Sequence, residues 1–139
     1  MRRLALVGAL GLLLATVAST LAAGTDQTWN ATISGNVTGK ATLALPASQS
    51  SATAILYLYR MKTGTKVTAE LRAATCSQTG SLIAPMPSFT TTSGGTWRDR
   101  LVSSGAGLRN LKAALAKDSP MSVRGTVGSQ KFCAEFALP

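Results

Sequence analysis

The sequence predicts an all-β domain, either an antiparallel β-sandwich or a flattened Greek-key barrel, with one short helical insertion. Short segments in which apolar and polar residues alternate recur along the chain, and turn residues separate them. A single stretch, residues 108–117, has apolar residues at helical spacing. The two cysteines, Cys76 and Cys133, have only each other as partners, and we expect them to form a disulfide if the chain is exported.

Residues 1–23 have the organisation of a signal peptide. Arg2 and Arg3 precede the uncharged apolar segment 4–17, and small residues follow around Ala22. We expect cleavage after Ala22 or Ala23 and a secreted or periplasmic location, with an uncleaved membrane anchor as the alternative. After cleavage no transmembrane segment is expected. Residues 24–139 are then one domain, long enough to bury its own core.

The first half of this domain contains four predicted strands. Residues 28–34, 40–45 and 52–60 each alternate between an apolar and a polar side, and 52–60 is apolar enough to be a central strand. Residues 65–73 alternate again and lead directly to Cys76. Because only a short loop joins 52–60 to 65–73, we expect these two strands to form a hairpin.

The second half begins with a segment rich in Gly, Pro, Ser and Thr. We expect loops there up to Gly95, with short strands at 82–84 and 88–91, and then a strand at 96–102. The helix at 108–117 follows, and a strand at 121–127 precedes the last one. In that last strand the apolar residues point inward and Cys133 points outward, so a disulfide to Cys76 would lie on the outer face of a sheet. The inward residues are Phe132, Ala134, Phe136 and Leu138.

The chain is strongly basic. It has 14 Lys and Arg against 5 Asp and Glu, and a charge of about +7 remains without Arg2 and Arg3. The basic residues are scattered, which is typical of solubilising surface charge, and association with an anionic cell-surface polymer or a protein partner is the alternative. We do not expect nucleic acid as a partner, because there is no run of like charges and few aromatic residues are available for stacking on bases.

The order of motifs resembles the copper/zinc superoxide dismutase-like sandwich and the related secreted CHRD-type domains. The resemblance rests on Ala-Ala-Thr-Cys-Ser-Gln-Thr-Gly at 73–80, the Gly-Gly loop, Met-Ser-Val-Arg-Gly at 121–125 and Phe-Cys-Ala-Glu-Phe at 132–136. In that family a cysteine that follows a histidine-bearing strand is linked to a cysteine of the last strand. The resemblance implies the sandwich fold and the Cys76–Cys133 bond.

The chain departs from that family at the metal site. It contains no histidine, and Glu70 and Arg72 stand where the resemblance places the metal ligands. A guanidinium cannot ligate copper, so we expect no metal, no cofactor and no catalytic residue. The absence of histidine also excludes a Ser-His-Asp triad. The competing class is an enzyme, either a dismutase with unusual ligands or a hydrolase built on Glu70 and Asp99.

Two groups of residues are candidates for partner binding. Glu70 and Arg72 share one face of a strand, and they are able to pair with each other or to contact a ligand. Trp97, Arg98 and Arg100 place an aromatic ring among cations next to a glycine-rich loop, a combination that suits glycans or peptides. For each group we expect first a structural role, namely a solvated face for the first pair and a core position for Trp97 with paired surface charges, and partner binding is the alternative. The sequence therefore predicts an exported, non-catalytic domain that binds a partner or has a structural role in the cell envelope, with basic adhesion to anionic surfaces as a further alternative.

Overall fold

The computed structural model describes residues 24–137 and forms two four-stranded antiparallel sheets with one helix. One sheet has the strand order β1-β2-β3-β6 and the other has the order β5-β4-β7-β8. In chain order the elements are β1 (Gln27–Ile33), β2 (Gly39–Leu45), β3 (Ala52–Met61), β4 (Lys66–Ala73), β5 (Ser81–Thr90), β6 (Gly95–Ser103), α1 (Ala106–Ala116), β7 (Ser122–Val127) and β8 (Gln130–Glu135).

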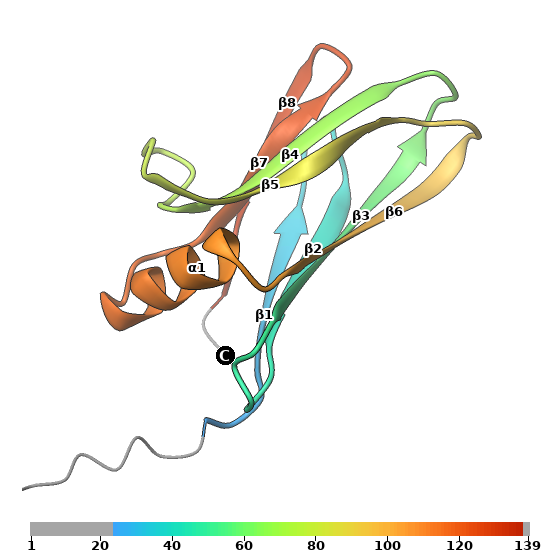
Figure 1. Cartoon of the computed structure of the whole chain (residues 1–139). Coiled ribbons are helices and arrows are strands. Elements are labelled where there is room, and N and C mark those ends of the chain that lie inside the picture. The colour runs from blue at the N-terminus through green and yellow to red at the C-terminus, as the bar shows by residue number, and fades with distance from the viewer. Residues whose placement is uncertain (1–23, 138–139) are drawn as a thin grey trace, which may run out of the picture.

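The two sheets face each other and enclose the core, so the predicted β-sandwich is confirmed (Figure 1). Alternation along the strands decides which side chains enter it, because successive residues of a strand point to opposite faces of the sheet. Leu56 and Leu58 of β3 are buried against the opposite sheet, where Val67 of β4 and Val123 of β7 are also buried. Each such side chain contributes about 1.5–3 kcal/mol of hydrophobic stabilisation. The predicted signal peptide and the inward position of Leu138 lie outside the described residues.

The predicted hairpin between strands 52–60 and 65–73 is wrong. β3 and β4 belong to different sheets: β3 pairs with β2 and β6, while β4 pairs with β5 and β7. The connection crosses over one end of the sandwich after a register shift between Leu58 and Met61, where Arg60 has a φ of 55°. Both strands keep their apolar sides toward the common core. The alternation is therefore the same for a connection between the two sheets as for a hairpin within one sheet, and it does not distinguish them. The prediction that residues 52–60 form a central strand is confirmed.

The segment expected to be loops with two short strands contains one long strand, β5. It pairs with β4 at the edge of its sheet, with two register shifts along the pair. Pro85 and Pro87 lie within it and cannot donate a backbone hydrogen bond. An edge strand tolerates this loss because only one of its sides is paired. The prolines therefore indicated an edge rather than a loop.

The predicted helix is confirmed, two residues earlier at its start and one at its end. Leu108, Leu111 and Ala114 are buried against the sandwich, mainly against β5. Asn110 fixes the packing, because its amide nitrogen donates to the carbonyl oxygen of Ile83 at 3.1 Å. Figure 1 shows α1 beside one end of the two sheets. Within residues 24–137, no helix has the length and apolarity to cross a membrane.

Two contacts draw the sheets together at their edges. The backbone nitrogen of Ala137 donates to the carbonyl oxygen of Asn30 at 2.9 Å, which joins the segment after β8 to β1. At the opposite edge, the rings of Phe89 in β5 and Trp97 in β6 stack with an interplanar angle of 8°. The sandwich is therefore held at both long edges.

Candidate functional site

The predicted disulfide between Cys76 and Cys133 is confirmed. The two Cα atoms are 5.8 Å apart, and the bond links positions separated by 57 residues. Cys133 points away from the core, as expected, since its neighbours Phe132 and Ala134 are the buried ones. The bond therefore ties residues 74–80, which we call the cysteine loop, to the outer face of β8. Glu135 strengthens this attachment, because its carboxylate accepts a hydrogen bond from the backbone nitrogen of Cys76 at 2.8 Å.

Glu70 and Arg72 pair with each other on the outer face of β4. The Nε atom of Arg72 lies 2.5 Å from Oε1 of Glu70. This hydrogen bond raises the pKa of Arg72 above its usual value, because it favours the charged guanidinium. Nη1 of Arg72 also donates to the carbonyl oxygen of Gly80 at 3.0 Å. The paired Arg72 therefore holds the end of the cysteine loop against β4.

Arg124, which the sequence analysis did not single out, holds the same loop from β7. Its Nη2 atom donates to the carbonyl oxygens of Thr75 at 3.0 Å and Gln78 at 2.9 Å, and lies 3.1 Å from Oγ of Ser122. Its Nε atom is buried and has no hydrogen-bond partner within residues 24–137. Arg124 is in register with both Glu70 and Cys133 on the neighbouring strands. That pairing could have identified it, but the register was not readable from the sequence.

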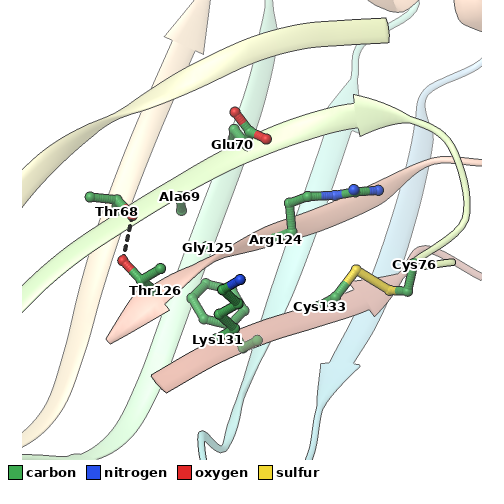
Figure 2. A pocket seen from close by; sticks show the side chains of 10 residues that line it. Thr68, Ala69, Glu70, Cys76, Arg124, Gly125, Thr126, Lys131 and Cys133 are labelled. Atoms are coloured by element: carbon green, nitrogen blue, oxygen red, sulfur yellow. Dashed lines mark hydrogen bonds between the residues drawn. A yellow bond between two sulfur atoms is a disulfide. The ribbon is translucent and has the colours of Figure 1, made fainter. Parts of the chain in front are cut away.

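A hollow of about 610 Å³ opens on this outer face beside the disulfide (Figure 2). Two cross-strand rows form it. One row contains Thr68, Thr126 and Lys131, and the parallel row contains Glu70, Arg124 and Cys133. The two threonines are short, whereas Glu70, Arg124 and Lys131 are long, so the space above the threonines stays open. The hollow is lined by Thr68, Ala69, Glu70, Cys76, Arg124, Gly125, Thr126, Lys131, Phe132 and Cys133.

The other predicted group lies on the outer face of the opposite sheet. Arg98 and Arg100 are exposed on β6, two residues apart and on the same side, so their Cα atoms are about 7 Å apart. Tyr57 of β3 is in register with Arg98, and Lys40 of β2 is in register with Tyr57. Lys40 Nζ lies 5.0 Å and Arg98 Cζ lies 5.8 Å from the centre of the Tyr57 ring, distances typical of cation–π contacts. We call Lys40, Tyr57, Arg98 and Arg100 the basic face.

The basic face has no acidic neighbour in an ion pair. Among residues 24–137, the one ion pair joins Arg72 and Glu70 on the other sheet. Asp99 lies between Arg98 and Arg100 in the sequence, but it points to the other side of β6. Its carboxylate accepts a hydrogen bond from the backbone nitrogen of Arg100 at 2.7 Å. The three cations are therefore free to attract an anion.

Trp97 does not share this face. Its side chain is half-buried on the inner side of β6 and stacks on Phe89, so the structure separates it from Arg98 and Arg100. Glu70 and Asp99 are also separated, because they lie on strands of different sheets. In the described part of the chain, no group of three or more metal-ligating side chains gathers at one place.

Comparison with known proteins does not assign the chain to a family. No family model matches the chain, and neither does any curated protein or solved structure. The site is therefore interpreted from its own geometry.

Proposed function

We propose that this protein is an exported, non-catalytic binding domain whose basic face binds an anionic polymer of the cell surface. The observation that carries the proposal is the arrangement of Lys40, Arg98 and Arg100. All three are exposed, and none has an ion-pair partner among residues 24–137. Lys40 projects from β2 and the two arginines from β6, on the same face of one sheet, and Tyr57 of the intervening strand β3 lies between Lys40 and Arg98.

The sheet gives these cations fixed relative positions. Strand pairing sets the distance between Lys40 and Arg98 across β3, and the Tyr57 ring restrains both side chains. Long cationic side chains lose conformational entropy when they bind, so restraining them in advance reduces that cost. A repeating polymer of carboxylates, sulfates or phosphates fits such an array, because several of its charges are able to meet several cations at once.

The disulfide and the chemistry of the chain support the rest of the proposal. A disulfide is compatible with an extracytoplasmic location, where such bonds persist. The scaffold is a sandwich of two antiparallel sheets, and the chain has no histidine for a redox metal. A stable sandwich with a charged outer face suits binding better than catalysis.

Retention on immobilised heparin tests the proposal. The test variant is K40Q/R98Q/R100Q, and the matched control is R109Q/K112Q/K117Q, which removes three exposed cations from or next to α1. Both variants have the same net charge. We expect the dissociation constant of the test variant to rise at least about tenfold at low salt, and that of the control to change less than about threefold.

The salt dependence gives the second readout. Binding of the unmodified protein is expected to weaken steeply between low and physiological salt, since the attraction is screened. Equal losses in the two variants would show that net charge alone binds heparin, and salt-independent retention would exclude an electrostatic mode. Either result would overturn the proposal.

A further inference from the structure

The hollow beside the disulfide is a second polar surface, on the opposite sheet from the basic face. Its volume of about 610 Å³ lies within the range of pockets that take small molecules, roughly 300–1,000 Å³. Its lining combines two hydroxyls, an ammonium group, a carboxylate and the guanidinium of Arg124, which come from β4, β7 and β8 (Figure 2). The proposed binding of polymers does not use any of these groups.

The floor of the hollow offers a hydroxyl hydrogen to a ligand. Oγ1 of Thr68 and Oγ1 of Thr126 are 2.7 Å apart, so one hydroxyl donates to the other. The accepting hydroxyl keeps its own hydrogen, and both oxygens keep a free lone pair. This pair of groups suits a ligand with neighbouring hydroxyls, which both donate and accept.

The two ends of the hollow carry opposite charges, of which the positive one is unpaired and the negative one is already in an ion pair. Lys131 is exposed and has no ion-pair partner among residues 24–137, so its ammonium group is available to an anion. Glu70 is already paired through Oε1 with Arg72. Its charge is largely compensated, which makes it a weak partner for a ligand cation, but Oε2 remains an acceptor for a ligand hydroxyl.

The walls of the hollow are fixed before any ligand arrives. The disulfide forms one wall, and Arg124 is held by the carbonyl oxygens of Thr75 and Gln78. Gly125 lets β7 approach β4 closely at the floor, because a Cβ atom at this position would overlap the carbonyl oxygen of Thr68. A rigid polar site loses little entropy when it binds.

From these groups we infer that the hollow binds a monosaccharide unit with a carboxylate, that is, a sugar acid. The carboxylate contacts Lys131, and ring hydroxyls contact the pair Thr68–Thr126 and Oε2 of Glu70. An amino acid fits less well because its ammonium group would meet a carboxylate that Arg72 already neutralises. This inference does not depend on the basic face.

Titration of the disulfide-bonded protein with glucuronic acid, followed by amide chemical shifts, tests the inference. We expect saturable shifts at Thr68, Gly125, Thr126 and Lys131. The variants K131Q and T126V should each weaken the binding about tenfold, since each removes one directed polar contact. The control variant K112Q, on the exposed side of α1, should bind as the unmodified protein does. Unchanged shifts away from the hollow will show that the variants are folded.

Glucose and glycine test separately whether the ligand's carboxylate and its ring hydroxyls are needed for binding. Glucose lacks the carboxylate and glycine lacks the ring hydroxyls, so both should bind at least about tenfold more weakly than glucuronic acid. Equal binding of either compound, shifts confined to Lys40 and Arg98, or no saturable shift would overturn the inference. Heparin retention should be the same for K131Q and K112Q, which separates this result from the test of the basic face.

Discussion

Arg124 and Gln78 are joined by a hydrogen bond of 2.9 Å between the guanidinium Nη2 atom and the carbonyl oxygen. This contact connects β7 to the cysteine loop, which the disulfide already connects to β8. Arg72 adds a third attachment from β4 through the carbonyl oxygen of Gly80. A loop of seven residues is therefore attached to three neighbouring strands, and arginine side chains of the sheet donate to the carbonyl oxygens of Thr75, Gln78 and Gly80.

The first prediction concerns Arg124. R124A removes two hydrogen bonds from a charged donor to the loop, so we expect the free energy of unfolding to fall by about 2 kcal/mol. Urea denaturation measures this change, and amide hydrogen exchange in residues 75–80 should become faster. R109A, on the exposed side of α1, is the control and should change stability by less than about 0.5 kcal/mol. Equal stability of R124A and R109A would contradict the structural role of Arg124.

The second prediction concerns the disulfide. The bond closes a loop across 57 positions, and the chain-entropy treatment gives about 4 kcal/mol for a loop of this length. C76S/C133S should therefore unfold at a much lower urea concentration than the oxidised protein. Reduction of the unmodified protein should give the same midpoint as the double variant. If the oxidised and reduced proteins unfold together, the bond does not stabilise the native state.

The third prediction concerns Gly125. A methyl group at this position overlaps the carbonyl oxygen of Thr68 in the paired strand, and backbone cannot move aside as a flexible side chain can. We expect G125A to lose at least about 3 kcal/mol or to fail to fold. S104A is the control, because Ser104 is exposed and lies outside the strands and the helix. Circular dichroism during thermal unfolding compares them, and a native melting temperature for G125A would refute the prediction.

The fourth prediction separates the two interpretations of Trp97. Because Trp97 stacks on Phe89 between the sheets, W97A should lower the free energy of unfolding by about 2–3 kcal/mol. Heparin retention, measured well below the melting temperature, should stay within about twofold of that of the unmodified protein. A stable W97A with lost retention would instead place Trp97 in the binding surface.

The strands were predictable because each one has a buried and an exposed side. Val67, Ala69 and Leu71 show this pattern clearly, and the structure buries all three. The alternation does not predict which strand pairs with which. β3 and β4 have the pattern of a hairpin, yet they pair in different sheets, since the core-facing side is the same in both arrangements. The prolines of β5 misled the prediction in a different way, because their tolerance depends on an edge position that only the topology defines.

The candidate site was predictable only in part. The disulfide followed from the number of cysteines, and its outer position followed from the alternation around Cys133. Arg124 was missed because its partners are backbone carbonyls 46 and 49 positions away. The basic face was recognised at Arg98 and Arg100, but Lys40 joins them through strand register across β3. Long-range contacts of this kind are absent from any local sequence pattern.

Pro85 and Pro87 have a consequence for behaviour at high concentration. An unpaired edge strand is a template onto which a strand of another molecule adds, and repeated addition leads to fibres. In β5 the two prolines remove backbone donors from that template. β6 has no proline, and Arg98 and Arg100 supply mutual repulsion between copies instead. Neutralising these two arginines should therefore make the protein more prone to fibrillation, whereas the β5 edge stays protected in any salt.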